Sequence, residues 1–479
     1  MSDNWDVIIV GAGSAGIPTA IFAGQRGARV LMIEADNRIG GTLHWSTGQL
    51  SAAGTKLQKK LGIDDHPDWH YEDCQRAMKN TVDPVLGRLA IDNAADTFDW
   101  LMDNGFELAP EMPVAEWGHE PYRVRRYQWG PNQALSVLEV MEPLLDVEIG
   151  RGSVTLSLET KLTGLVVEEG AVVGIEAEAR DGTSATIRGQ NVVLTTGGYA
   201  ANPELWADLT PGYPLRSHCN PYSRGDGIVA ARKIGAKVDR GDMFLCTFAG
   251  VMQDPDDPLS VRMGLTLNPR FRIPWEIYVN RAGKRFVRED HPSVDHREHA
   301  LLEQDGMETF VVFDEGIRQN APHFDPEVER EHVAKLFGKN PSYFKADTLA
   351  DLAAQCGIDA ANLEASVAEY NQAVETGTDP AFGREALQRP IDMPPYLAIR
   401  AVGMSVVSPA GINADGGLRV STADGSPIPN LYAAGEVLGF ARLSGAGFLG
   451  GMSLTPALTF GRLLGQKLLN WEGAREAAE

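Results

Sequence analysis

The sequence has few of the features that mark a secreted, metal-binding or membrane-spanning protein. Its 479 residues include only four cysteines, Cys74, Cys219, Cys246 and Cys356. No two of them form a CxxC pair or stand at metal-ligand spacing, so we expect neither a disulfide framework nor an iron–sulfur centre. No charged and apolar leader precedes the first strand, and no apolar run reaches about 18 residues. These absences favour a cytoplasmic protein that does not span a membrane.

Basic residues are scarce relative to acidic ones. There are 43 lysines and arginines against 65 aspartates and glutamates, which gives a formal net charge of −22. Because such a field repels phosphate backbones and anionic lipid surfaces, we expect no nucleic acid and no membrane as a partner. The basic run YRVRRY at 122–127 is either a local anion-attracting patch or, more commonly, a solvated face or structural arginine cluster. A small molecule remains the expected partner.

What is present at the N-terminus is a βαβ opening. Asp6–Val10 is a short apolar run typical of a buried strand, and the glycine-rich GAGSAG follows it directly at 11–16. A helical stretch then ends near Gly27, and Ala28–Glu34 predicts a second strand. A glycine-rich turn between a strand and a helix in this order favours a dinucleotide-binding fold.

The three glycines of GAGSAG have different expected roles. Gly11 suits the tight turn, Gly13 lets the backbone approach a pyrophosphate, and Gly16 allows close packing of helix and strand. The N-terminus of the helix supplies N–H donors and partial positive charge to phosphates. Glu34, at the end of the second strand, can accept hydrogen bonds from ribose hydroxyls. NAD and FAD share this fingerprint, so these residues leave both cofactors open.

The rest of the chain divides by pattern. Apolar residues at helical spacing fill Leu86–Leu101, whereas Gly164–Val173 and the run ending at Asn191–Leu194 have the character of strands. Residues 244–406 carry their own mixed signals, including an amphipathic stretch at Ala361–Val374, and the strand and glycine-rich pattern returns near Ile412. We therefore expect three segments: 1–243 and 407–479 form one domain, and 244–406 is an inserted capping domain that holds substrate.

The C-terminal segments favour FAD over NAD. NLYAAGEVLG at 430–439, the stretch 445–455 and FGR at 460–462 resemble the flavin-binding end of the fumarate reductase and succinate dehydrogenase flavoprotein family. The resemblance continues in GGT at 40–42 with TGQLSAA at 47–53, in RGDG at 224–227 and in NRAGKRFVRE at 280–289. The sequence is most similar to the soluble fumarate reductases and the 3-ketosteroid dehydrogenases. This family implies an α/β fold, a Rossmann-like FAD-binding domain from two chain segments with an inserted α+β capping domain.

The resemblance also implies a set of FAD contacts and a mode of attachment. In membrane-bound relatives a histidine near the second glycine-rich stretch carries FAD covalently. Thr42 falls at that place, so we expect noncovalent FAD, and His44, two residues away, is expected to be structural. The implied cofactor-binding residues are Gly11, Gly13, Ser14, Ala15, Gly16, Glu34, Gly41, Thr42, Thr47, Gly48, Gly197, Asp226, Glu436, Ser453 and Leu454.

At the implied substrate site the family pattern breaks. Fumarate reductases hold two carboxylates with histidines and arginines, because a dianion needs paired cationic donors. Ala249 and Val406 or Val407 fall where the histidines are expected, and Phe448 replaces the carboxylate-binding arginine. Ser293 replaces the proton-donating arginine. Arg272 survives from the relay leading to it, while the acid partner falls near Pro269. This pattern favours a neutral, ketonic or aromatic substrate.

We therefore expect reversible carbon–carbon double-bond chemistry, most readily the desaturation of a neutral ketone. The ketosteroid dehydrogenases use tyrosines for the proton, one of them in the stretch where Phe448 lacks the hydroxyl. His291 is the candidate acid or base. Ser293 and Tyr278 are further catalytic candidates, and Ala249, Arg272, Val407 and Phe448 are the expected substrate contacts.

Two other functions stay open. One is an ene-reductase for a polar or monocarboxylate alkene, with Arg272, Arg297 or Arg442 supplying the missing cation. The other is a flavoprotein that only relays electrons to a partner. A nicotinamide-dependent disulfide reductase is disfavoured, because the redox cysteine pair and a second GxGxxG are absent. The electron acceptor is not specified by any motif.

Overall fold

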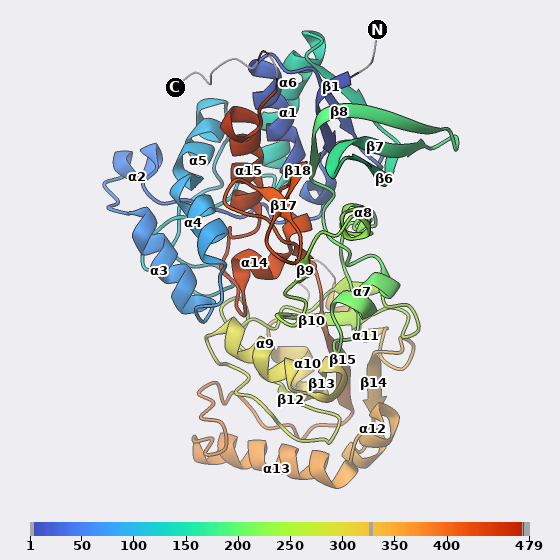
Figure 1. Cartoon of the computed structure of the whole chain (residues 1–479). Coiled ribbons are helices and arrows are strands. Elements are labelled where there is room, and N and C mark those ends of the chain that lie inside the picture. Colours follow the sequence, from blue (N-terminus) through green and yellow to red (C-terminus); the bar gives the residue numbers. More distant parts are fainter. Residues whose placement is uncertain (1–3, 325–328, 472, 474–479) are drawn as a thin grey trace. The chain divides into compact units, whose positions relative to one another are not determined.

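The computed structural model describes residues 4–324, 329–471 and 473, and they form two compact units (Figure 1). The first unit contains Met1–Pro211, Cys219–Phe244 and Val407–Glu479, and the second contains Gly212–His218 and Leu245–Val406. Both ends of the chain thus contribute to the first unit. The short stretch 212–218 joins the second unit although no sequence pattern set it apart.

The first unit is organised around a sheet whose central strands are parallel. Its order is β17–β18–β8–β1–β2–β5, and only β17 runs antiparallel to its neighbour on this path. The side chains of β1 and β2 are largely apolar and buried, as strands covered on both faces require. The bounds are β1 Asn4–Val10, β2 Val30–Ile33, β5 Val154–Ser157, β8 Ser184–Leu194, β17 Arg419–Ser421 and β18 Pro427–Ala433.

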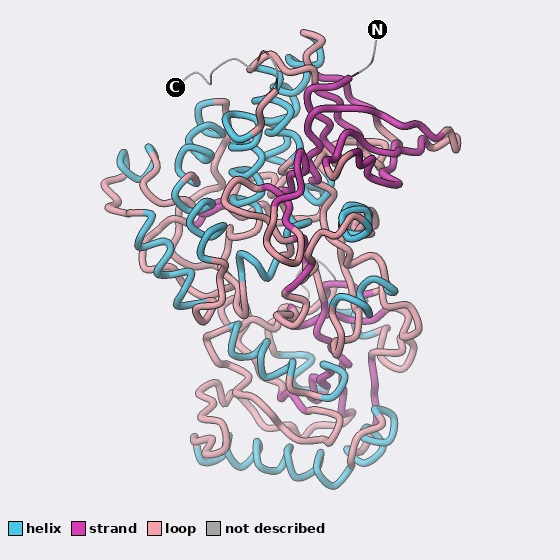
Figure 2. The backbone as a smooth tube through the Cα atoms, in the orientation of Figure 1, coloured by secondary structure: helices cyan, strands magenta, loops and turns pink. Residues whose placement is uncertain are grey.

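A β-hairpin extends this sheet through β8, and it corrects one sequence prediction. The run Gly164–Val173, expected as one strand, is divided between β6 (Thr160–Glu168) and β7 (Ala171–Ala179). Glu169 and Gly170, with φ of 48° and 82°, form the two-residue turn. Both residues adopt the left-handed conformation that favours a tight hairpin. Figure 2 shows the long paired strands of this hairpin.

Helices complete the first unit. The region Leu86–Leu101 forms two helices rather than one, because Asn93 ends α4 and begins α5 and its side chain donates to the carbonyl of Leu89. The bounds are α1 Gly16–Gln25, α2 Lys56–Lys60, α3 Pro67–Ala77, α4 Pro84–Asp92, α5 Ala94–Asp103, α6 Leu135–Gly150, α7 Pro203–Leu209, α8 Asp226–Lys233, α14 Phe440–Ser444 and α15 Leu454–Leu463. Two short pairs, β3 (Leu50–Ser51) with β4 (Tyr127–Gln128) and β9 (Val238–Asp239) with β16 (Gly411–Ile412), complete its strands.

The second unit is an α+β structure with its own sheet. Its order is β11–β10–β15–β13–β12, all antiparallel, and β14 also pairs with β15. The strands are β10 Thr247–Met252, β11 Val261–Met263, β12 Ile277–Val279, β13 Glu308–Asp314, β14 Tyr343–Ala346 and β15 Tyr396–Met404. The helices are α9 Val294–Leu302, α10 Glu315–Asn320, α11 Arg330–Ala334, α12 Leu349–Cys356 and α13 Ala360–Thr376. Within the described ranges no helix is long and apolar enough to cross a membrane.

Candidate functional site

A cleft in the first unit lies where the carboxyl ends of β1, β2, β8 and β18 meet. Together with the open solvent at its mouth it has a volume of about 1050 Å³, and it is lined by segments that directly follow each of these strands. The segments are 10–15, 33–35, 195–197 and 435–436, joined by residues near 41–46, 160–162, 220–226 and 453–457. In open α/β sheets, ligands bind at this edge. The topology therefore places a nucleotide-sized site where the glycine-rich motif ends.

The three glycines of GAGSAG meet different surroundings in the cleft. Gly11 has φ of 105°, and a Cβ added there would lie 2.5 Å from the carbonyl oxygen of Thr195. A Cβ on Gly16 would clash with the carbonyl oxygen of Gly11. A Cβ on Gly13 would meet no protein atom within 4 Å. The protein's own packing thus requires Gly11 and Gly16, whereas Gly13 leaves open space of the kind that a pyrophosphate needs.

Glu34 is fixed at the end of β2 by backbone amides. Its Oε2 accepts from Ala12 N at 2.7 Å and its Oε1 accepts from Asp36 N at 2.9 Å. Burial raises the pKa of Glu34, and these backbone hydrogen bonds oppose that effect. Each carboxylate oxygen keeps a second lone pair. The arrangement fits a group that accepts from the ribose hydroxyls of a dinucleotide.

A second buried carboxylate lines the cleft after β18. Glu436 accepts from Ser408 N through Oε1 at 2.8 Å, and burial raises its pKa. Nearby, the hydroxyl of Thr196 is buried and has no hydrogen-bond partner among the described residues. A buried polar group without a partner calls for a ligand or ordered water. This unpaired hydroxyl and the space at Gly13 both fit a bound FAD, which would supply the redox-active ring.

The cleft contains most of the implied cofactor residues. Gly16, Thr47 and Gly48 are the exceptions, because they do not line it. Gly48, with φ of 74°, instead packs against Ala134. The lining members are Gly11, Gly13, Ser14, Ala15, Glu34, Gly41, Thr42, Gly197, Asp226, Glu436, Ser453 and Leu454.

Sequence reasoning missed several lining residues. Thr160 and Leu162 come from the start of β6, and Thr195 and Thr196 directly precede Gly197. The others, Asn220, Tyr222 and Ser223, come from the loop just before Asp226. The motif RGDG at 224–227 directly follows this loop, and it is the sequence signal that could have indicated these residues. No motif marked β6, because its place in the cleft depends on the pairing of distant strands.

The comparisons with known proteins bear on this cleft. The family model described as FAD binding domain matches residues 6–454. The chain belongs to this family. It is an FAD-dependent oxidoreductase, and a fumarate reductase (cytochrome) of Shewanella frigidimarina is 32% identical to it over 467 residues, covering 97% of this chain and 77% of the relative. The resemblance inferred from the motifs is thereby confirmed.

Solved structures agree with the fold. The open conformation of a flavocytochrome c3 fumarate reductase matches with a TM-score of 0.74 at 27% identity, over 98% of this chain and 78% of the other. A 3-ketosteroid delta1-dehydrogenase from Sterolibacterium denitrificans, in complex with 1,4-androstadiene-3,17-dione, matches with a TM-score of 0.76 at 21% identity, over 98% of this chain and all of the other. The latter likeness concerns the fold alone.

Phe448, the residue expected in place of a carboxylate-binding arginine, lies between two rings of the first unit. Its ring centroid is 4.1 Å from that of His119 and 5.4 Å from that of Phe440, and the contact with Phe440 is stacked. Burial lowers the pKa of His119 to about 4. Two aromatic rings therefore contact Phe448, and burial favours the neutral form of one of them, His119. Sequence reasoning missed His119, which no motif marks.

The pKa of His119 predicts a pH-dependent loss of stability. In the unfolded chain an imidazole titrates near pH 6.5, so between about pH 6.5 and 4 the unfolded chain binds the proton more readily. The stability that neutral His119 contributes is present above pH 6.5 and is lost as the pH falls toward 4. Urea unfolding at a series of pH values should show a smaller loss for His119→Phe than for the wild type. An equal loss in both would contradict this placement.

The basic run at 122–127 is a structural arginine cluster rather than an anion-attracting patch. Arg126 is fully buried and contacts Asp65 at 2.6 Å and Asp73 at 2.7 Å, and Arg123 also contacts Asp73. Tyr122 donates to the carbonyl of Gly450 at 2.7 Å. Carboxylates already pair with both arginines, which agrees with the structural arginine cluster that the sequence favoured over a basic patch.

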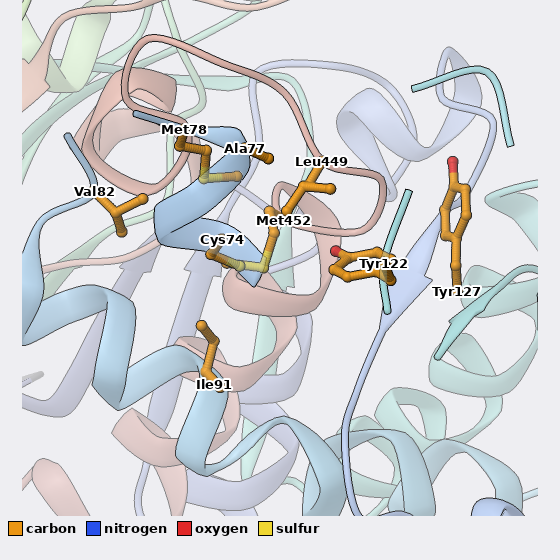
Figure 3. Close-up of a cluster of buried hydrophobic side chains, with 9 residues drawn as sticks. All are labelled: Cys74, Ala77, Met78, Val82, Ile91, Tyr122, Tyr127, Leu449 and Met452. Atoms are coloured by element: carbon orange, nitrogen blue, oxygen red, sulfur yellow. The ribbon is translucent and has the colours of Figure 1, made fainter. Parts of the chain in front are cut away.

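These contacts support the segment that leads into the cleft. Leu449 and Met452 pack with Cys74 of α3 and with Tyr122 in one buried apolar cluster (Figure 3). Ser453 and Leu454, which follow directly, line the cleft. The arginine cluster therefore holds the chain that shapes one wall of the FAD site.

The candidate catalytic residues of the second unit have different surroundings. Ser293 caps α9, and its hydroxyl accepts from His296 N at 3.0 Å. The rings of His291 and His296 stack with centroids 4.1 Å apart, and Nδ1 of His291 accepts from Ser293 N. Desolvation and the neighbouring His296 lower the pKa of His291. A neutral His291 can therefore donate only through Nε2.

Tyr278 and Arg272 belong to a buried network around Glu276. Arg272 contacts Glu276 through Nη1 at 2.7 Å and Nη2 at 2.8 Å, and the Tyr278 hydroxyl donates to the same carboxylate at 3.4 Å. The carboxylate partner of Arg272 is thus Glu276, four residues later, whereas the position at which the family pattern places an acid falls near Pro269. Tyr278 is fully buried, and burial raises its pKa. Both side chains already have protein partners.

The remaining expected substrate contacts have no polar side chain. Val407 lies in the loop after β15, and Ala249 lies within β10, with its side chain outside the described residues. Arg442, one of the alternative cations, contacts Asp83 and Asp239. It therefore already has carboxylate partners.

Proposed function

We propose that the protein moves hydride reversibly between FAD and a carbon–carbon bond next to a carbonyl group, and that it most readily desaturates a neutral cyclic ketone. The observation that carries this proposal is the surroundings of Phe448. A fumarate reductase needs cationic donors for its dianionic substrate. Here an aromatic ring lies between Phe440 and a neutral His119. We propose that these rings contact the substrate, where they favour a flat, uncharged ring over a dicarboxylate.

The first half of the proposed reaction, from the saturated ketone to the enone and reduced FAD, needs only FAD and a protein base. FAD held in the cleft would supply the two-electron acceptor for the hydride that leaves the β-carbon. The α-proton leaves to a protein base, and the double bond forms between the two carbons. His291 is the proposed acid or base. Its Nε2–H can donate the proton in the reductive direction, whereas taking the α-proton requires Nδ1 to release the hydrogen bond that it accepts from Ser293 N. An external electron acceptor, whose identity we leave open, reoxidises FAD.

We also propose that FAD is held without a covalent bond. Thr42, at the position corresponding to the covalent histidine of membrane-bound relatives, lines the cleft and offers no imidazole. His44 has its Nε2 2.9 Å from the carbonyl oxygen of Ile39, which gives that ring a structural contact. Acid precipitation should therefore release all the flavin into the supernatant.

A matched pair of substrates tests the proposed substrate class. Dye-linked assays would compare cyclohexanone and 2-cyclohexen-1-one with cyclohexanecarboxylate and 1-cyclohexenecarboxylate, each in both directions. The proposal predicts a higher kcat/KM for the ketone pair. Turnover confined to the acids would contradict it.

One observation favours a second candidate, an ene-reductase for a monocarboxylate alkene. Of the three cations proposed for that role, Arg272 and Arg442 have carboxylate partners. Arg297 has none among the described residues. A preference for the acid pair in the same assays would select this second candidate.

A further inference from the structure

Arg297 is a buried guanidinium with few partners. It lies in the second turn of α9 and is 1% exposed. Its Nη1 donates to the carbonyl oxygen of Leu267 at 2.7 Å, and its guanidinium carbon lies 5.9 Å from the centroid of the Phe248 ring. Its Nε is buried and has no hydrogen-bond partner among the described residues. One carbonyl and one aromatic face therefore provide the described contacts of a full positive charge.

Seven other arginines are buried among the described residues. Arg26 donates to the carbonyl oxygens of Gly465 and Leu469 and lies over the ring of Trp471. Each of the other six has an acidic partner, with a carboxylate oxygen within 4.0 Å of its guanidinium: Arg126, Arg272, Arg285, Arg384, Arg442 and Arg462. Arg272 is the nearest comparison, because it lies in the same unit and is also almost fully buried. The usual solution for a buried arginine in this fold is thus an acidic partner, and Arg297 departs from it.

Burying an unpaired charge is unfavourable, because the lost hydration is not replaced. Desolvation accordingly lowers the pKa of Arg297, and the neighbouring Tyr278 and Glu298 oppose that effect only in part. A protein tolerates such a group where a ligand completes its hydrogen bonds, and functional sites are the usual places for a local arrangement that lowers stability. The donors of a guanidinium match the lone pairs of a carboxylate or an enolate oxygen.

We propose that Arg297 binds an oxygen atom of the substrate, either a carboxylate or the carbonyl oxygen that gains negative charge as hydride reaches the β-carbon. This inference rests on the proposed function and adds the residue that holds the activating group. In the desaturation direction, Arg297 would stabilise the enolate formed when the α-proton leaves. A carboxylate and a ketone share this chemistry, and the test below separates them.

Thermal unfolding of the FAD-loaded protein tests the proposal without using activity. Arg297→Met keeps the apolar stem and removes the uncompensated charge, so we expect its Tm to rise by a few degrees. The matched control is Arg272→Met, which leaves Glu276 buried and unpaired and should lower the Tm. A Tm for Arg297→Met that falls as in the control would show a structural arginine and overturn the proposal.

The second arm adds a ligand probe. Cyclohexanecarboxylate and cyclohexanone, each at a series of concentrations, should raise the Tm of the wild type for at least one probe and leave Arg297→Met unchanged. A rise with the acid only identifies a carboxylate site, and a rise with the ketone identifies a carbonyl site. No rise with either probe, or an equal rise in the variant, would overturn the proposal. If no hydride transfer is detected but these Tm shifts appear, the proposed reaction is wrong, whereas the proposal that Arg297 binds a ligand oxygen is supported.

Discussion

Gly13→Val is expected to leave the protein folded while weakening FAD binding by at least about 100-fold, equivalent to roughly 2.7 kcal/mol. A Cβ added at residue 13 meets no protein atom within 4 Å, so we expect the free protein to accommodate a small side chain there. The same space is where the backbone must approach the pyrophosphate. Titration of the flavin-free protein with FAD, followed by fluorescence, measures the change in Kd.

The control for this experiment is a glycine that also has open space but lies away from the cleft. Gly150, the last residue of α6, meets no atom within 4 Å of an added Cβ. Gly150→Val should bind FAD as the wild type does. If Gly13→Val keeps its FAD affinity, the cleft is not the pyrophosphate site. Circular dichroism of the flavin-free variant verifies that it remains folded.

Arg126→Met is expected to lower the free energy of unfolding by about 3–5 kcal/mol, because it leaves the buried carboxylate of Asp65 without its cation and removes the one fully buried cation of Asp73. Asp65 and Asp73 both lie within 2.7 Å of the guanidinium, and all three side chains are almost fully buried. The guanidinium also lies over the ring of Tyr122, 5.1 Å from its centroid. Urea unfolding of the FAD-loaded protein measures the loss.

The neighbouring Arg125→Met is the matched control. Arg125 is exposed, so the same change there should alter stability by less than about 0.5 kcal/mol. Because Tyr122 and its neighbours support the chain before Ser453, Arg126→Met should also bind FAD more weakly. Equal stabilities for the two variants would show that the buried ion pairs contribute little.

The nucleotide-binding end of the fold could be predicted because its signals are local. A buried strand, three glycines with distinct spacing needs and a strand ending in Glu34 occupy a single stretch of about 30 residues. The errors in placing element boundaries also had local causes. Apolar periodicity continues across Asn93 and across the turn at Glu169 and Gly170, so it did not reveal where one element ends and the next begins.

The rest of the site depends on contacts between distant residues. Thr160 reaches the cleft through the pairing of β2 with β5 and the start of the hairpin, which periodicity does not specify. Glu276 pairs with Arg272 where the family pattern placed no acid. From the sequence, Arg297 was equivalent to Arg272 and Arg442 as a candidate cation. The structure distinguishes it, because Arg272 and Arg442 have carboxylate partners. A sequence shows that a residue is charged, whereas only the packed structure shows whether an oppositely charged side chain lies next to it.

Anaerobic mixing of the FAD-loaded protein with substrate tests the central claim of hydride exchange most directly. We predict that the visible absorbance of the oxidised flavin falls on adding cyclohexanone and recovers when reduced protein meets 2-cyclohexen-1-one. Deuterium at the β-carbon of the ketone should slow the fall. A flavin that neither ketone nor enone, nor the corresponding acid pair, reduces or reoxidises would contradict the account.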